Sequence, residues 1–276
     1  MRARAALVFI AVLLACAPGG ARQEPGRDYR FHSAALGREM PYRVLMPAAH
    51  ATGRRYAVLY LLHGLGGHFD DWTEYTRLAD YVDGQDLIVV MPEGANSWYV
   101  NWHDGAAERW EDYLARDLVA EVDARFPTDA RREGRFIAGL SMGGYGALRL
   151  GLKHPDRYAI AASLSGAFDV TRRETYGWND ALRDEFRRTF GPMDSARRQE
   201  DDVMALASRA TPVGLPLLYI DCGADDPFLP GNREVAAILQ RRDVPYEYRE
   251  TPGRHDWHYW DRQIVEVLHL IDRATR

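Results

Sequence analysis

A serine in the middle of a glycine-bounded motif could supply a nucleophile. The motif Gly139-Leu140-Ser141-Met142-Gly143 follows a short apolar run at 135–138 and opens a stretch with helical spacing of apolar residues. A strand that turns sharply into a helix lifts the serine hydroxyl clear of a sheet, and small flanking residues let the chain pass close to its neighbours. The motif alone is a weak signal, and a glycine-rich helix start that binds nothing is the alternative. The strand–turn–helix setting favours a nucleophile.

A serine hydroxyl reacts only when a base takes its proton and a carboxylate orients that base. Where a nucleophile follows such a turn, the chain order is serine, acid, histidine. Asp225 and Asp226 follow a predicted strand at 215–222, although either could simply cap a turn. His255 lies in a loop before the last helix and His258 at the start of that helix. His255 is better placed to reach the sheet edge, so we expect it to be the base.

The negative charge that develops during acyl transfer needs two backbone N–H donors. One donor should be Met142, directly after the serine. The other should come from the glycine-rich stretch 63–67, which leaves an earlier predicted strand, and Leu65 is the candidate there. An ordinary glycine-rich turn is the alternative.

These residues need a scaffold, and the apolar pattern supplies one. Continuous or alternating apolar runs predict strands, and amphipathic spacing predicts helices at 110–126 and 257–273. Strands that alternate with helices predict an α/β fold with a mostly parallel sheet covered on both faces. The polar, partly helical stretch 168–212 could cap the site as a partial lid. The predicted strands are 42–47, 56–62, 87–91, 135–138, 159–164, 215–222 and 246–250.

Composition agrees with one globular catalytic domain. The chain has 276 residues, of which 46% are hydrophobic and 27% charged, and its net charge is −5. That balance gives no reason to expect a nucleic-acid partner, which would require a basic face. Nine histidines leave a metal hydrolase as an alternative, but no His-Glu-x-x-His spacing or similar ligand pattern occurs. We therefore expect no metal and no cofactor.

The first 21 residues predict a secretory signal and not part of the fold. Two arginines precede a short apolar run at 5–15, which is shorter than the roughly 20 residues that span a bilayer. The sequence Leu13-Leu14-Ala15-Cys16 is similar to a lipoprotein signal, in which Cys16 is lipidated, and cleavage after Ala21 is the other interpretation. A buried N-terminal helix is a further alternative. The catalytic domain is then 22–276, in an exported protein that we expect to lack a disulfide framework, since only one other cysteine exists.

The motifs together resemble a known family of α/β-hydrolases. The sequence is similar to the family that includes esterase D, S-formylglutathione hydrolases, mycolyltransferases and bacterial feruloyl and tributyrin esterases. The resemblance implies the α/β-hydrolase fold. It also maps the family acid onto Asp226 and the family histidine onto His255. The segments that carry it are 62–67, 96–99, 139–147, 223–228 and 253–257.

The resemblance implies a serine carboxylic-ester hydrolase with a Ser-His-Asp triad and an acyl-enzyme, and the signal pattern at residues 1–21 implies that it is exported. Small-molecule esters with short or aryl acyl groups, including acetyl and feruloyl esters of carbohydrates, fit an exported chain better than a cytosolic thioester does. Trp98 and Tyr99 are expected to form an aromatic wall for an aryl or sugar group, with plain packing as the alternative. Two other functions remain open, namely an acyltransferase of the mycolyltransferase type and a non-catalytic hydrolase fold used for binding.

Overall fold

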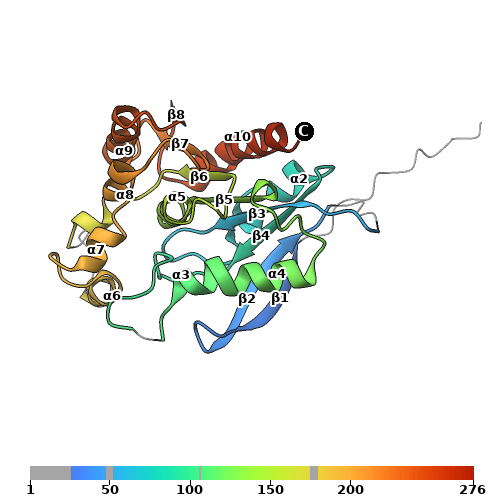
Figure 1. Cartoon of the computed structure of the whole chain (residues 1–276), viewed down its shortest axis with the longest axis horizontal. Coiled ribbons are helices and arrows are strands. Elements are labelled where there is room, and N and C mark those ends of the chain that lie inside the picture. Colours follow the sequence, from blue (N-terminus) through green and yellow to red (C-terminus); the bar gives the residue numbers. More distant parts are fainter. Residues whose placement is uncertain (1–25, 48–51, 106, 175–179) are drawn as a thin grey trace, which may run out of the picture.

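The computed structural model describes residues 26–47, 52–105, 107–174 and 180–276. The predicted signal at 1–21 and Cys16 therefore lie outside the described residues. Within those ranges one sheet of eight strands runs through the middle of the molecule, with helices on both of its faces (Figure 1).

The strand order across the sheet is β1-β2-β4-β3-β5-β6-β7-β8. The pairs β1–β2 and β2–β4 are antiparallel, and all other neighbouring pairs are parallel. This arrangement confirms the predicted α/β-hydrolase fold. The strands are β1 (Arg27–Ser33), β2 (Arg38–Leu45), β3 (Ala57–Leu62), β4 (Leu87–Pro92), β5 (Arg135–Leu140), β6 (Ile160–Leu164), β7 (Leu217–Gly223) and β8 (Tyr246–Thr251).

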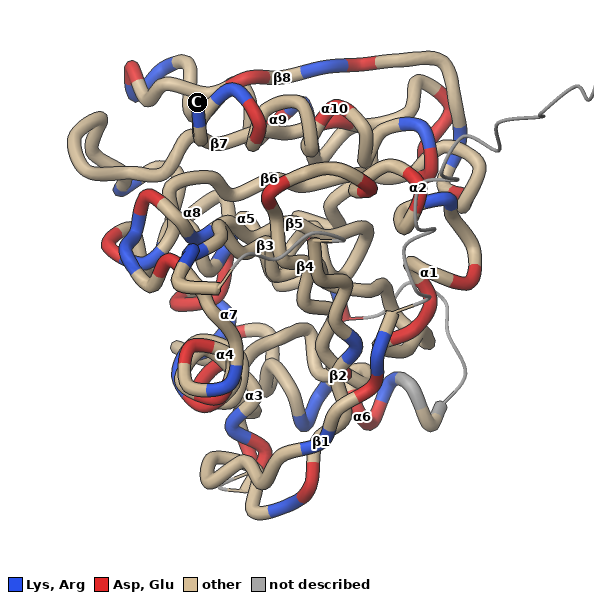
Figure 2. The backbone as a smooth tube through the Cα atoms, turned by 90° about the vertical axis from the view of Figure 1, so that its right-hand side faces the viewer, with Lys and Arg blue, Asp and Glu red and all other residues tan. Residues whose placement is uncertain are grey.

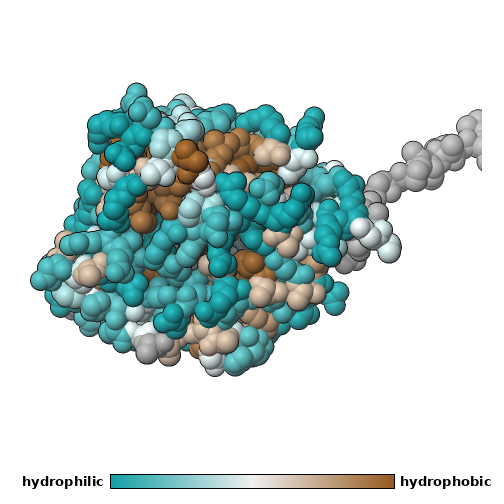
Figure 3. Space-filling model, viewed as in Figure 1, coloured by the Kyte–Doolittle hydropathy of each residue, from teal (hydrophilic) through white to brown (hydrophobic). Residues whose placement is uncertain are grey.

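The central strands are apolar because both of their faces are covered. Every residue of β4, β5 and β6 is buried, as continuous apolar runs in a parallel sheet require. In Figure 2 the tube is tan along β3 and β4, whereas charged segments of both signs lie interspersed around the outside. The face drawn in Figure 3 is mostly hydrophilic, with apolar side chains gathered mainly in its upper half.

The helices form two layers, and each layer packs into its own hydrophobic cluster. The layer on one face comprises α1 (Asp71–Tyr75), α2 (Leu78–Val82) and α10 (Trp257–Thr275). The layer on the other face comprises α3 (Trp110–Asp112), the π-helical segment Tyr113–Leu118, α4 (Val119–Arg125), α5 (Met142–Lys153), α8 (Val203–Arg209) and α9 (Leu229–Arg241). None of the helices in the described part of the chain is long and apolar enough to cross a bilayer.

Most predicted elements occur within two or three residues of their expected bounds. One strand was missed: β1 pairs with β2 at the sheet edge, and its charged residues obscure the alternation of Tyr29 and Phe31. The helix predicted at 110–126 exists, but six of its residues are π-helical. The stretch 168–212 contains the 3₁₀ turn Val170–Arg172 and the helices α6 (Asp180–Phe190), α7 (Ala196–Glu200) and α8. A second 3₁₀ turn, Arg132–Gly134, comes directly before β5.

The helix that follows Ser141 is anchored by a buried ion-pair cluster. Arg149 of α5 is fully buried, and its guanidinium contacts the carboxylates of Glu111 and Asp201. Lys153 Nζ and His154 Nε2 lie 2.9 and 2.8 Å from Glu111 carboxylate oxygens. Burial by itself would raise the pKa of the Glu111 carboxyl, but the basic groups beside it outweigh this effect and hold that pKa far below its ordinary value. The cluster ties α5 to the helix at 110–125 and to the end of α7.

Candidate active site

Ser141 stands at a strained turn between β5 and α5. Its backbone angles are φ 53° and ψ −114°, a conformation that residues other than glycine rarely adopt. A Cβ on Gly139 would lie 2.5 Å from the carbonyl carbon of Gly143. A Cβ on Gly143 would lie 2.6 Å from the carbonyl oxygens of Leu62 and His63. The glycines of the motif are therefore required sterically, because β3 and the turn pass too close for side chains.

The structure brings Ser141, His255 and Asp226 into one hydrogen-bonded chain. His255 Nε2 lies 3.0 Å from Ser141 Oγ, and His255 Nδ1 lies 2.9 Å from Asp226 Oδ2. A carboxylate can only accept, so Nδ1–H donates to Asp226 and Nε2 is left to accept the serine proton. Asp226 is buried, and its other oxygen accepts a 2.8 Å hydrogen bond from the N–H of Phe228. This geometry can perform nucleophilic attack with general-base assistance.

Two aromatic rings hold the His255 imidazole in place. The rings of Phe228 and Trp260 lie edge-on to it, each with its centroid 4.9 Å away. Trp260 is fixed in turn, because its Nε1–H donates to Ser165 Oγ at 3.2 Å. The sequence offered no signal for these contacts, since they join three segments that are distant along the chain.

The two alternative residues lie outside this arrangement. Asp225 is exposed, and its N–H donates to the carbonyl of Gly253 at 2.9 Å. His258 is exposed on the first turn of α10, where its Nε2 lies 3.5 Å from Arg262 Nη1. Among the described residues, the hydrogen bonds that form the chain at Ser141 involve His255 and Asp226 and neither of these two side chains.

The loop after β3 lies against the serine turn, as an oxyanion hole requires. A Cβ on Gly64 would lie 2.7 Å from the Leu140 side chain and 3.5 Å from Ser141 Cβ. The next residue, Leu65, lines the cavity at Ser141, and its N–H has no acceptor among the described residues. Met142 is the first residue of α5, where helix geometry leaves the N–H without an intrahelical acceptor. Both N–H groups are therefore available to an oxyanion.

Asn96 holds that loop, a role that the sequence did not reveal. Its Oδ1 accepts a 2.9 Å hydrogen bond from the N–H of Gly66, whose φ is +73°. Its Nδ2 donates to Glu185 of α6 at 3.4 Å. Asn96 lies within a segment that carried the family resemblance, but its type alone does not distinguish a loop support from a surface amide.

The expected aromatic wall is corrected by burial. Trp98 is 3% exposed and packs against Tyr145, Phe186 and Phe190. Tyr99 is fully buried, and its hydroxyl donates to the carbonyl of His63 at 3.0 Å. Neither residue is among those that line the cavity at Ser141, and both pack in the core under the loop.

Other aromatic residues line the cavity that contains Ser141. Its volume is about 640 Å³, and Tyr75, Trp257 and Trp260 form part of its wall. Tyr75 is 56% exposed and stacks on Trp257 with ring centroids 5.0 Å apart. Asp71 also lines the cavity, and burial raises the pKa of its carboxyl above the ordinary value. In the described part of the chain, no group of three or more His, Cys, Asp or Glu side chains could hold a metal ion.

A second buried carboxyl lies behind the triad. Asp221 of β7 is fully buried, and it accepts a hydrogen bond from the hydroxyl of Tyr259. Burial raises the pKa of Asp221 to about 7. Its carbonyl accepts the N–H of Ser165 at 2.7 Å, so Asp221 supports the residue that fixes Trp260.

The sequence and the structure both have known relatives. An acetyl esterase of Caldicellulosiruptor saccharolyticus is 30% identical over 223 residues, covering 79% of this chain and 84% of the relative. A diacylglycerol acyltransferase/mycolyltransferase of Mycobacterium bovis is 24% identical, covering 94% of this chain and 85% of its own length.

Among solved structures, a substrate-bound fluorophosphonate-binding serine hydrolase of Staphylococcus aureus superposes with a TM-score of 0.81 at 30% identity. The match covers 90% of this chain and 98% of the other. A family model named Esterase, with the description "Putative esterase", matches residues 33–271. The chain therefore belongs to this esterase family of α/β-hydrolases and is a carboxylic-ester hydrolase.

Proposed function

We propose that the protein is an exported serine esterase that works through a Ser141–His255–Asp226 triad and an acyl-enzyme. Ser141 Oγ attacks the ester carbonyl while His255 Nε2 takes its proton. The N–H groups of Leu65 and Met142 stabilise the negative oxygen of the tetrahedral intermediate. His255 then gives the proton to the departing alcohol. In the second half of the reaction His255 takes a proton from water, which attacks the acyl-enzyme, and returns the proton to Ser141 Oγ as the acid is released. The observation that carries this proposal is the unbroken hydrogen-bond chain at the strained turn.

The substrates that we propose are esters of short-chain or aryl acids, including acetyl and feruloyl groups on carbohydrates. Two features support this class: the exposed Tyr75–Trp257 stack beside Ser141, which offers an apolar face to a ring, and the acetyl esterase relative. Asp71 in the same wall accepts hydrogen bonds and so suits a leaving group rich in hydroxyls.

One substrate panel tests this proposal. A single preparation is assayed on p-nitrophenyl acetate, methyl ferulate, acetylated xylan and a short acyl thioester, with Ser141→Ala as the control. We expect turnover of the acetyl and aryl esters to exceed that of the thioester, and Ser141→Ala to remove it. Preference for the thioester would contradict the substrate class and leave the triad intact.

An acyltransferase activity is the second candidate, favoured by the mycolyltransferase relative. Both reactions share the acyl-enzyme and differ in whether water or an alcohol accepts the acyl group. Adding a sugar alcohol to the assay and measuring the ratio of new ester to free acid separates them. We expect free acid to dominate.

Export is proposed from the basic and apolar pattern of residues 1–21, with lipidation at Cys16. We expect the mature protein to partition into the detergent phase and Cys16→Ala to release it into the soluble fraction. An unmodified mature N-terminus at Arg22 would contradict lipidation and keep export.

A further inference from the structure

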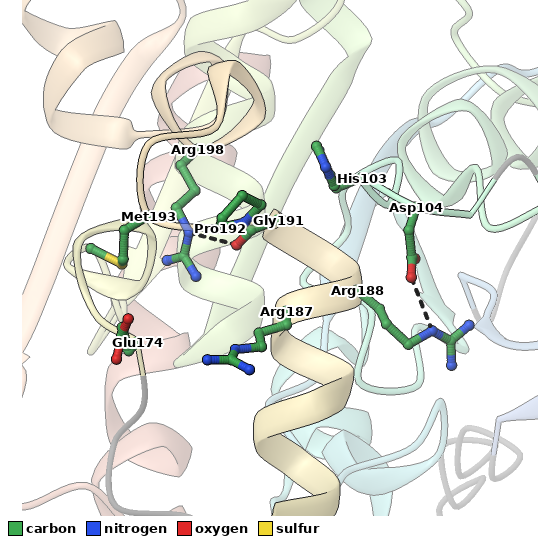
Figure 4. Close-up of a pocket in the computed structure, with 9 residues that line it drawn as sticks. All are labelled: His103, Asp104, Glu174, Arg187, Arg188, Gly191, Pro192, Met193 and Arg198. Atoms are coloured by element: carbon green, nitrogen blue, oxygen red, sulfur yellow. Dashed lines mark hydrogen bonds and ion pairs between the residues drawn. The ribbon is translucent and has the colours of Figure 1, made fainter.

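A second cavity lies at the C-terminal end of α6. Its volume is about 390 Å³, and its walls come from the loop 103–104, Glu174, the end of α6 and the start of α7 (Figure 4). None of its lining residues lines the cavity at Ser141. It is therefore separate from the ester site.

Arg198 supplies this cavity with a fixed positive charge. Arg198 is only 3% exposed. Its Nε donates to the carbonyl oxygen of Gly191, and its Nη1 donates to the carbonyl oxygens of Thr171 and Arg173, at distances of 2.8–3.0 Å. Two phenylalanine rings of α6 face the guanidinium. These partners hold the group without neutralising it, and burial lowers its pKa from the ordinary value. Nη2 makes none of these hydrogen bonds.

The charged side chains that line the cavity in the described part of the chain leave one positive charge in excess. Arg188 turns away toward Asp104, with Nε 3.5 Å from a carboxylate oxygen, and the two charges cancel (Figure 4). Arg187 extends on the same side of α6 as Arg198 (Figure 4), and no ion pair found among the described residues includes it. Among the described side chains that line the cavity, Glu174 is then the one carboxylate set against two guanidinium groups, and its field acts on Arg198.

The uncharged part of the wall offers surface to a small ring. The Met193 side chain is 42% exposed there, beside Pro192 and the His103 imidazole. His103 packs directly on Gly191, where a Cβ would lie 2.8 Å from the ring, and the φ of Gly191 is +75°. A cavity of this size, at the lower end for ligand sites, holds one small ligand.

We propose that this cavity binds a carboxylate-bearing ring of the acidic-sugar class. Arg187 and the free Nη2 of Arg198 hold the carboxylate, while Met193 and His103 contact the ring. Guanidinium groups match planar carboxylates with paired hydrogen bonds. One net positive charge matches a singly charged carboxylate better than a doubly charged phosphate monoester. A free uronic acid and a uronic acid unit within a polysaccharide share this chemistry.

The position of α6 links the cavity to the ester site. Glu185 contacts Asn96, which in turn holds Gly66 of the loop at Ser141. Glu185 and Arg187 are two residues apart, about 3 Å along the helix axis. An acidic polysaccharide held at the cavity would therefore lie beside the helix that contacts the loop at Ser141. The link between this binding and ester hydrolysis rests on the proposed function. Binding of a free uronic acid does not depend on it.

Titration calorimetry on the mature Ser141→Ala protein tests the cavity independently of catalysis. The probes are galacturonic acid, galactose as the matched neutral sugar, inorganic phosphate and an acidic oligogalacturonide. We expect saturable binding of galacturonic acid, weakened about tenfold or more by Arg187→Gln. Arg197→Gln is the matched control, because Arg197 pairs with Glu200 at 3.6 Å and lies outside the cavity. It should leave the affinity unchanged.

Equal affinity for galacturonic acid and galactose, tighter binding of phosphate, or no effect of Arg187→Gln would each overturn the proposal. Tighter binding of the oligogalacturonide than of the free acid would identify a polysaccharide as the source. Equal binding would identify the free acid. Either result supports the carboxylate site, and neither depends on esterase activity.

Discussion

In the proposed triad, Asp226→Asn removes the charge that would stabilise the His255 imidazolium while keeping the size of the side chain. In the structure the carboxylate oxygen lies 2.9 Å from Nδ1 and is buried. At an effective dielectric constant of about 20, unit charges at that distance attract by about 6 kcal/mol. That energy corresponds to about 10⁴-fold in kcat, at 1.36 kcal/mol for each tenfold change. The amide also offers a donor to Nδ1, which favours the wrong tautomer.

The assay is steady-state hydrolysis of p-nitrophenyl acetate near pH 7.5, with Asp225→Asn as the matched control. Asp225 is exposed, and the ring nitrogens of His255 hydrogen-bond Asp226 and Ser141 instead, so its change should alter kcat less than about threefold. Circular dichroism and a melting curve establish that both variants fold. A folded Asp226→Asn enzyme within tenfold of the wild type, or a larger loss in Asp225→Asn, would refute the assignment of the acid.

Three further predictions concern the supports of the site. Asn96→Ala should lower kcat by about tenfold without unfolding the protein, because the loop loses the acceptor at Gly66; unchanged kcat would contradict this. Arg149→Met should lower the free energy of unfolding by about 3–5 kcal/mol in urea titrations, since it leaves two carboxylates buried beside fewer cations; a loss under about 1 kcal/mol would contradict it. Asp221 binds a proton more tightly when folded, with a pKa of about 7 against 3.8, so its contribution to stability is lost as pH rises from about 4 to 7. Asp221→Asn should therefore stabilise the protein by up to about 4 kcal/mol at pH 8 and by less at pH 5; equal effects at both would contradict this.

The sequence predicted the fold well because its central strands are unambiguous. Runs such as those of β3 and β4 are apolar throughout, which only strands covered on both faces require. The edge strand β1 escaped prediction because a strand with one solvated face carries charges that blur the pattern. The π-helical turns at 113–118 escaped as well, since helical spacing does not distinguish one helical hydrogen-bond register from another.

Within the candidate site, local motifs mark some residues in the sequence, whereas residues positioned by tertiary contact carry no such mark. Ser141 and Leu65 stand in glycine-rich turns that a motif can identify. Asn96 and Trp260 act through partners that lie 30 and 95 positions away, at Gly66 and Ser165 respectively, so no local pattern marks them. Trp98 is the opposite case: its residue type and loop position suggested a ligand contact, whereas its burial, which the sequence does not show, places it in the core.

The central claim is that Ser141 is the nucleophile and that His255 activates it. Covalent labelling with a fluorophosphonate, followed by peptide mass spectrometry, tests it most directly. We predict one adduct, on the peptide that contains Ser141, with labelling abolished in Ser141→Ala, at least 100-fold slower in His255→Ala and unchanged in His258→Ala. An adduct on another residue, or labelling of His255→Ala at the wild-type rate, would contradict the account.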